Sequence, residues 1–360
     1  MKVIKIFLLF IGMLYCSACD GDLQKAKTLY RQSQTVELKT SVPLADPLGE
    51  AIATLENYLA RNPDNASATL LLWRCYVQTG HPRAQAMSDN MLRMPEKMRQ
   101  IFPREIRREL DDSKREQMVY LFGKIATMQE AGALIGILEK DHSTNVQRAA
   151  ADVLAQINAD AAVPSLLRKL PTTQPAVRLY ACRALSSFPQ PQVTTALISR
   201  VVDIQEAPEV RQQAAQSLAQ ICRQEFHERE ALVMQLRQLL EDEAGPTLTR
   251  LLVASTLAAL GQTLGYDLAI KCAASADPFM RGVAIITLGY IGDKQALPYL
   301  TDALEYGNKA LRLQAAEALG RLGHQKALPS LYKALNDPSD AVRAAANQSI
   351  AKIKAQGTNG

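Results

Sequence analysis

The hydrophobic positions of the chain recur in a pattern about 31 residues long. Four stretches carry it clearly: VRLYACRALSSF, VRQQAAQSLAQI, LRLQAAEALGRL and VRAAANQSIAKI. In each, an opening residue is followed by Arg and then by small or apolar residues at offsets +4, +5, +8 and +11. The openings fall at Lys114, Val146, Val177, Val210, Thr249, Met280, Leu311 and Val342, at spacings of 32, 31, 33, 39, 31, 31 and 31. A period of this length predicts a repeat protein.

The offsets predict a helix at each opening. Offsets 0, +4, +8 and +11 form one stripe of a helix with 3.6 residues per turn, so we expect this stripe to be buried. The +8 position is large and apolar in every copy: Phe122, Leu154, Leu185, Leu218, Leu257, Leu288, Leu319 and Ile350. Small residues dominate offsets +4 and +5, for example Ala315 and Ala316. Their size allows neighbouring helices to approach closely.

A second amphipathic stretch precedes each opening, for example at 162–170, 295–304 and 326–335. Proline near the start of these stretches suits the first turn of a helix. Gly292 and Gly323 stand where a left-handed cap ends the following helix. This helix–turn–helix unit resembles the short HEAT-like repeat of bilin lyases. The resemblance covers 95–355 and implies an all-α, right-handed α-solenoid of helical hairpins. The step of 39 residues before Thr249 predicts a longer first helix around 227–242 or an insertion near 242–246.

Residues 19–94 do not follow this repeat. Ala51, Leu55 and Tyr58 would share a helix face, Pro63, Asp64 and Asn65 would form a turn, and Leu72, Tyr76 and Gly80 would mark the next helix and its end. This arrangement resembles a tetratricopeptide repeat junction, preceded by a loop at Thr35–Pro47. At the other end of the chain, a disordered tail is expected at 356–360.

The N-terminus has the layout of a secretory signal. Lys2 and Lys5 precede an apolar run from Ile6 to Tyr15 that is too short for an ordinary membrane-spanning helix. The residues that follow resemble a bacterial lipobox, with Cys16 in the position where Leu is usual. The resemblance implies removal of residues 1–18 as a signal peptide and a lipid on Cys19, and Asp20 then favours the inner membrane. An ordinary cleaved signal and an uncleaved anchor remain alternatives.

Composition and charge narrow the classes of function. Only 5% of the 360 residues are aromatic, which favours closely packed helices over a β-sandwich. The net charge of +5 falls to +3 without Lys2 and Lys5 and is dispersed along the chain. The arginines of 93–115 are interleaved with Glu and Asp, so we interpret this stretch as a solvated helix face. Nucleic-acid binders concentrate Lys and Arg on one face, so no nucleic-acid partner is expected.

Candidate chemistry is scarce in the sequence. HEAT-like repeats also build the deoxyhypusine hydroxylases, which hold two metals with several His-Glu pairs, whereas this chain has one, His227-Glu228. One pair cannot supply such a site, and no nucleotide-binding, hydrolase or zincin motif occurs. We therefore expect no catalytic residue, metal or cofactor. Four cysteines inside helical patterns are interpreted as small buried hydrophobes, although an exported chain could pair two: Cys75, Cys182, Cys222 and Cys272.

Arginine recurs at offset +1, at Arg115, Arg178, Arg211, Arg250, Arg281, Arg312 and Arg343. The row could bind phosphates. Acidic residues such as Asp112 and Asp340 stand just before some of these arginines, so a structural role, in pairs with loop carboxylates, is the preferred interpretation.

The second helices should also present an inner face, at offsets +2, +3, +6 and +10. In the repeat that opens at Val210 this face consists of glutamines and is interpreted as solvated. In the next two repeats it turns apolar, which predicts an exposed strip with a polar rim, a common mark of an interaction site. The alternative is that curvature or the longer repeat covers the strip. The predicted partner-binding residues are Leu251, Leu252, Val283, Ile286, Tyr290, Gln314, Glu317 and Arg321.

These patterns favour a scaffold that is lipid-anchored in the cell envelope, on the extracytoplasmic side, and binds a peptide or helix of a protein partner. The alternatives from another class are an enzyme similar to the bilin lyases and a metal-dependent hydroxylase. The partner's identity, the oligomeric state and any disulfide pairing stay open.

Overall fold

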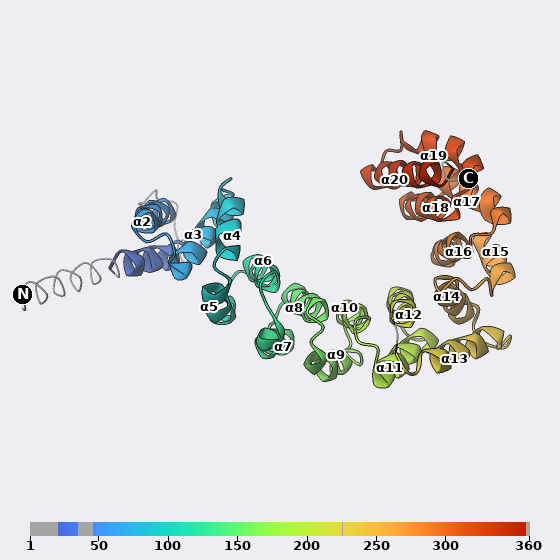
Figure 1. Cartoon of the computed structure of the whole chain (residues 1–360), viewed down its shortest axis with the longest axis horizontal. Helices are drawn as coiled ribbons and strands as arrows, with labels where there is room; N and C mark the ends of the chain where they lie inside the picture. Colours follow the sequence, from blue (N-terminus) through green and yellow to red (C-terminus); the bar gives the residue numbers. More distant parts are fainter. Residues whose placement is uncertain (1–20, 35–45, 225, 358–360) are drawn as a thin grey trace, which may run out of the picture. The chain divides into compact units, whose positions relative to one another are not determined.

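The computed structural model describes residues 21–34, 46–224 and 226–357, and within these ranges the chain consists of helices joined by short turns, without a strand (Figure 1). The predicted all-α solenoid of helical hairpins is confirmed. The predicted signal peptide, Cys19, Asp20, most of the loop at 35–47 and the last three residues of the expected tail lie outside the described residues. Contacts divide the chain into two units, 1–159 and 160–360.

In its described residues, the first unit has four helices that precede the repeats, and then two hairpins. The preceding helices are 21–34, α2 (Pro47–Arg61), α3 (Ala66–Thr79) and α4 (Ala84–Leu92). The hairpins are α5 (Pro95–Arg108) with α6 (Asp112–Gly123), and α7 (Ala131–Lys140) with α8 (Thr144–Gln156); the single-turn helix η1 (Met128–Glu130) precedes α7.

Local signals fix the ends of the α2–α3 hairpin. The carboxylate of Asp46 accepts hydrogen bonds from the first backbone N–H groups of α2, and Asn65 caps α3 by accepting from the N–H of Ala68 at 3.0 Å. Gly80 ends α3 with a φ of 65°. Leu55 and Tyr76 are buried in the core that α2 and α3 share with 21–34. The predicted hairpin is therefore present, and its kinship with tetratricopeptide repeats stays a prediction.

The described residues of the second unit form six hairpins (Figure 1). They are α9 (Val163–Lys169) with α10 (Pro175–Leu185), α11 (Pro191–Val202) with α12 (Pro208–Cys222), α13 (Arg229–Glu241) with α14 (Thr247–Ala258), α15 (Tyr266–Ala273) with α16 (Pro278–Ile291), α17 (Leu297–Tyr306) with α18 (Lys309–Leu322), and α19 (Leu328–Ala334) with α20 (Asp340–Gly357). The single-turn helices η2 (Asp160–Ala162), η3 (Lys294–Ala296) and η4 (Gln325–Ala327) precede α9, α17 and α19.

The repeat pattern places the second helices correctly. Each predicted opening is the third residue of its second helix, and every +8 residue is buried. In the second unit, α10, α12, α14, α16, α18 and α20 contact one another in succession. The longer step before Thr249 comes mostly from a longer first helix, because α13 has 13 residues and α15 has 8. The helix before it is also longer, since α12 has 15 residues and α14 has 12. Gly292 and Gly323 end their helices with φ values of 74° and 68°, as predicted.

Three of the arginines at offset +1 join the helices of their own repeat and link it to the next. Arg178 donates to the carbonyl oxygen of Thr172 at 2.7 Å, in the turn of its own hairpin. It also donates to both carboxylate oxygens of Glu206 at 2.7 and 2.6 Å, in the turn of the next hairpin. Arg312 likewise donates to the carbonyl oxygen of Gly307 and to the carboxylate of Asp337. Arg115 donates to the carbonyl oxygens of Glu109 and Leu110 and to the carboxylate of Asp141. The structural interpretation is confirmed for these three arginines.

The sequence predicts that the arginines pair with acidic residues just before them, and in the structure they also pair with acidic residues of the following repeat. Arg115 and Arg343 do pair with Asp112 and Asp340, but those two carboxylates are largely exposed. The less exposed partners belong to the following repeat: Asp141, Glu206 and Asp337.

The four described cysteines are buried and have free thiols: Cys75, Cys182, Cys222 and Cys272. Burial raises the pKa of the Cys182 thiol to about 12, which keeps it protonated at neutral pH. Their interpretation as small buried hydrophobes is confirmed. Among the described residues, no helix combines the length and the apolar character needed to cross a membrane.

Candidate functional site

Three residues of the predicted apolar strip are not exposed. Leu251, Leu252 and Val283 have exposed fractions of 0%, 1% and 2%. The reason is the contact between successive second helices, since α14 packs between α12 and α16, and α16 between α14 and α18. The expectation of a continuous exposed strip was therefore wrong. A charge introduced at Val283 would disturb folding, so it cannot serve as a test of binding.

The other predicted residues form a partly exposed group on α16 and α18. Tyr290 is 36% exposed, and the guanidinium of Arg321 lies 4.7 Å from the centre of its ring, a cation–π contact. Arg321 also pairs with the exposed Glu317 at 3.8 Å. Ile286 and Gln314 are half-buried. The structure thus brings together the C-terminal members of the predicted site.

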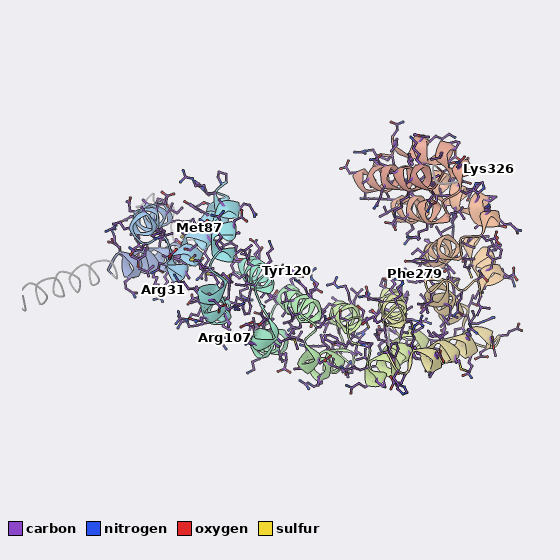
Figure 2. All side chains as sticks on the ribbon, in the orientation of Figure 1. Arg31, Met87, Arg107, Tyr120, Phe279 and Lys326 are labelled. Carbon is purple, nitrogen blue, oxygen red and sulfur yellow. The ribbon has the colours of Figure 1, made fainter. Side chains whose placement is uncertain are left out.

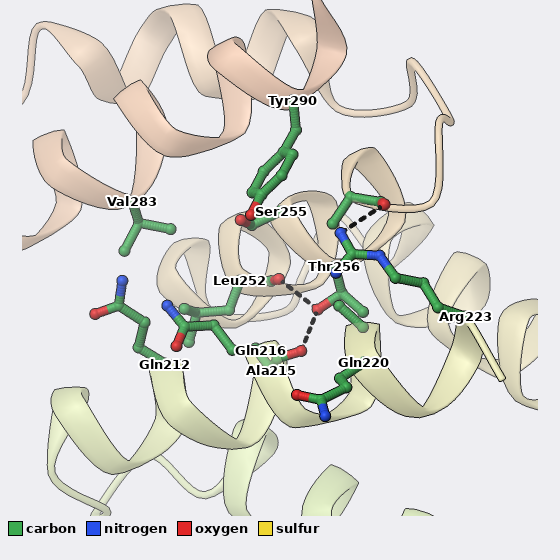
Figure 3. Close-up of a pocket in the computed structure, with 12 residues that line it drawn as sticks. Gln212, Ala215, Gln216, Gln220, Arg223, Leu252, Ser255, Thr256, Val283 and Tyr290 are labelled. Carbon is green, nitrogen blue, oxygen red and sulfur yellow. Dashed lines mark hydrogen bonds between the residues drawn. The ribbon is translucent and has the colours of Figure 1, made fainter. Parts of the chain in front are cut away.

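A hollow of about 320 Å³ lies on α12, α14 and α16, next to this group (Figure 3). It combines apolar side chains with amides. It is lined by Gln212, Ala215, Gln216, Ala219, Gln220, Arg223, Leu252, Ser255, Thr256, Ala259, Val283 and Tyr290. Leu252, Val283 and Tyr290 also belong to the site predicted from the sequence. Leu252 and Val283 form part of the apolar wall of the hollow.

The glutamines of α12 supply the polar side of this hollow. Gln212, Gln216 and Gln220 follow one another at intervals of four residues, so their side chains share one face of α12 (Figure 3). Within the described residues, none of the three side-chain amides has a hydrogen-bond partner. Gln216 and Gln220 are exposed and Gln212 is half-buried. The solvated interpretation of this face is correct, but it missed the hollow that the face borders.

Hydrogen bonds hold the walls of the hollow together. The buried hydroxyl of Thr256 donates within α14 to the carbonyl of Leu252 at 3.0 Å and across to the carbonyl of Ala215 on α12 at 3.1 Å (Figure 3). Arg223 donates to the carbonyl of Ala259 at 3.0 Å. These bonds tie α12 to α14, so the glutamines stand on a wall that is fixed relative to the apolar side.

The described residues offer little for metal chemistry. His227 and Glu228 are both exposed, and among the described residues no group of three or more His, Cys, Asp or Glu side chains could hold a metal ion. The hollow is suited to contact with a ligand through amides, an aromatic ring and apolar side chains.

Two segments of the chain match the family of HEAT repeats. Residues 131–219 and 266–351 match this family, and they span most of α7–α12 and α15–α20. No curated protein matches the chain.

Solved structures are similar to the chain at low sequence identity. Human deoxyhypusine hydroxylase in complex with glycerol is 20% identical, with a TM-score of 0.37 over 76% of this chain and 99% of the other. The complex of CpcE and CpcF of phycocyanin lyase from Nostoc is 20% identical, with a TM-score of 0.40 over 72% and 94%. The karyopherin Kap121p, bound to the extreme C-terminus of the protein phosphatase Cdc14p, is 16% identical, with a TM-score of 0.46 over 85% and 38%.

Proposed function

We propose that this chain is a membrane-anchored scaffold of the cell envelope that binds an extended segment of a protein partner in the hollow on α12, α14 and α16. The observation that carries the binding proposal is the row of amides on α12, since each offers donors and an acceptor without a partner among the described residues. A row of unpaired amides beside an apolar wall suits a ligand with both backbone polar groups and apolar side chains.

The spacing of the row matches an extended peptide. Four residues of helix rise about 6 Å, and two residues of extended chain rise about 6.6 Å. A peptide that runs along α12 can therefore present equivalent N–H and C=O groups to Gln212, Gln216 and Gln220 in turn. Its alternate side chains then point toward Leu252 and Val283 or away from them.

Tyr290 and Arg321 supply an anchor at the edge of the hollow. Tyrosine and arginine are the residue types that most often dominate binding energy at protein interfaces. The stacked guanidinium of Arg321 fixes the ring of Tyr290. When a ligand packs on this ring, the Tyr290 side chain therefore loses little conformational entropy.

The anchoring part of the proposal rests on the sequence of residues 1–20. Removal of residues 1–18 and acylation of Cys19 would hold the repeats at the extracytoplasmic side of a membrane. Two or three acyl chains suffice, because each buried methylene contributes about 0.8 kcal/mol.

The binding proposal is tested with the partner that the full chain captures from detergent-solubilised envelope. Overlapping peptides of that partner identify the bound segment, and its Kd is measured by fluorescence anisotropy. We expect the triple variant Gln212→Ala/Gln216→Ala/Gln220→Ala to weaken binding at least about tenfold, because each lost hydrogen bond contributes about 1 kcal/mol.

The matched control is Gln235→Ala/Gln238→Ala, which removes two exposed glutamines from α13, outside the hollow. Its Kd should equal that of the unchanged chain. Equal affinity of the triple variant and the control, with both folded by circular dichroism, would reject the hollow as the binding site.

A further inference from the structure

A second hollow, of about 500 Å³, lies in the first unit among 21–34, α3 and α5. It is unlike the first one because cationic side chains surround it. The lining residues are Gln24, Lys27, Tyr30, Arg31, Gln34, Ser67, Leu70, Leu71, Arg74, Arg104, Glu105, Arg108 and Leu110. Five of them are Lys or Arg and one is Glu. We call this feature the cationic hollow.

Within the described residues, the positive charge at the rim is not fully neutralised. Lys27 and Arg31 have no carboxylate partner within the described residues. On the opposite side, the single carboxylate of Glu105 is shared by Arg104 at 3.1 Å, Arg108 at 3.3 Å and Arg74 at 3.6 Å. Like charges in one concave site repel and focus a positive potential into it. The cationic hollow is therefore prepared for an anionic ligand.

Buried contacts hold the base of the hollow. Arg74 pairs with Glu109 at 2.5 Å, and the side chain of Glu109 is fully buried. The hydroxyl of Tyr30 donates to the same carboxylate at 3.3 Å, and the guanidinium of Arg74 lies 4.8 Å from the centre of the Tyr30 ring. The carboxylate of Glu109 is thus paired at the bottom of the hollow, so it does not neutralise the arginines and the lysine at the rim.

The cationic hollow also has an apolar surface. Leu70 and Leu71 of α3 are almost entirely buried and stand at its base, whereas Leu110, just after α5, is 79% exposed. An exposed leucine beside a concave apolar base marks a contact surface for apolar groups. A flat membrane surface would meet Leu110 and the rim but would not reach Leu70 and Leu71, so a ligand must project side chains into the hollow.

We propose that the cationic hollow binds an acidic amphipathic peptide segment of a protein. Apolar side chains of this segment insert against Leu70, Leu71 and Leu110, and its carboxylates pair with Lys27, Arg31, Arg104 and Arg108. The site is separate from the hollow on α12, α14 and α16 and uses charge where that one uses amides.

Fluorescence anisotropy with the full chain tests this assignment. The probe is a labelled synthetic peptide of about twelve residues in which leucine and glutamate recur with helical spacing. We expect it to bind at low salt, and its affinity to fall steeply toward about 0.5 M salt as the charges are screened. Counterparts with lysine for glutamate, or serine for leucine, should bind at least about tenfold more weakly, because the first reverses the charge complementarity and the second loses the apolar contact.

Charge reversal identifies the residues. Arg31→Glu/Arg108→Glu should weaken binding of the acidic peptide at least about tenfold, and the milder Arg31→Gln/Arg108→Gln should weaken it less but measurably. The matched control is Arg107→Glu, an exposed arginine of α5 that does not line the hollow (Figure 2). The triple variant Gln212→Ala/Gln216→Ala/Gln220→Ala, which alters the other hollow, should leave the affinity for the acidic peptide unchanged.

Three results would overturn the proposal. The first is absence of peptide binding at low salt, and the second is equal loss in Arg107→Glu and in the hollow variants. The third is binding to vesicles of anionic phospholipid that the acidic peptide does not displace, which would assign the rim to a membrane surface. Thermal unfolding of each variant shows whether the chain stays folded.

Discussion

At the scale of single residues, ion pairs with largely buried carboxylates link several repeats to the next. Glu206 shows this best, because its side chain is 1% exposed and accepts from Arg178, from Arg200 at 3.3 Å and from the N–H of Ala207 at 2.7 Å. Burial alone would raise the pKa of Glu206, but the hydrogen bonds from Arg178 and Ala207 outweigh it and lower the pKa below its ordinary value of 4.5. The folded chain therefore binds this proton less readily than the unfolded chain.

This shift predicts a pH dependence of stability. The contribution of Glu206 is fully present above its ordinary pKa of 4.5, and it is lost as the pH falls through the lower pKa of the folded state. We expect Glu206→Gln to lower the free energy of unfolding at pH 7 by about 3 kcal/mol, because it leaves the charge of the largely buried Arg178 without its partner. Urea unfolding at a series of pH values should show the difference from the unchanged chain shrink as the pH falls below 4.5.

The matched control is Glu305→Gln, which breaks an exposed pair with Lys333 at 3.4 Å between α17 and α19. Such pairs contribute less than about 1 kcal/mol. A Glu206→Gln variant that behaves like this control at every pH would show that the buried pair adds nothing to stability.

At the scale of helices, adjacent second helices are joined by a contact that recurs with the repeat. Ser217, Thr256 and Ser349 all stand at offset +7, and each hydroxyl donates to the carbonyl at offset +5 of the preceding repeat. The three bonds are Ser217 to Cys182 at 2.8 Å, Thr256 to Ala215 at 3.1 Å and Ser349 to Ala316 at 2.9 Å. They require the helix backbones to approach closely, which large side chains at the contact would prevent.

Glycine at offset +9 allows part of this close approach. Replacing it with alanine should destabilise the chain, whereas the same replacement at a glycine with open space around it should stabilise the chain. A Cβ at Gly289 of α16 would stand 2.8 Å from the Cα of Ala318 on α18. Gly289→Ala should therefore destabilise the chain by about 1–3 kcal/mol, since backbone must move. Gly136 of α7 has open space where a methyl group would stand, and Gly136→Ala should stabilise by about 0.5–1 kcal/mol.

Thermal unfolding of the two glycine variants measures both effects. A stabilising Gly289→Ala would show that α16 and α18 can separate without loss, and the close approach would then have no structural role.

What could be predicted from the sequence follows from this geometry. The stripe at offsets 0, +4, +8 and +11 lies within one helix, so periodicity alone locates every second helix. Burial of Leu251, Leu252 and Val283 depends on the neighbouring helices, which a single helical pattern does not include. The cationic hollow was missed for a similar reason, because Arg31, Arg74 and Arg108 come from three separate segments.

At the scale of the whole molecule, the proposals assign different tasks to different segments. In repeat arrays each unit contacts mainly its neighbours, so a binding surface can change without loss of the fold. The hollow on α12, α14 and α16 and the cationic hollow use different chemistry and can be altered one at a time. In the proposal, residues 1–20 determine where in the cell both surfaces are located, and the lipid on Cys19 would hold them there.

In the proposed function, anchoring depends on one residue, Cys19, that neither hollow includes. We expect Cys19→Ser to abolish incorporation of labelled fatty acid and to move the chain from the membrane fraction to the soluble fraction if the signal is still cleaved, or to leave an unprocessed precursor. Cys16→Ser is the matched control, since it alters the neighbouring cysteine of the same segment and should keep both the label and the membrane fraction. Fatty acid label that persists in Cys19→Ser and disappears in Cys16→Ser would place the anchor on the other cysteine. Absence of label in the unchanged chain would instead leave the binding surfaces without a lipid tether, and the test of the cationic hollow would stand unaffected because it uses the full chain with a synthetic peptide.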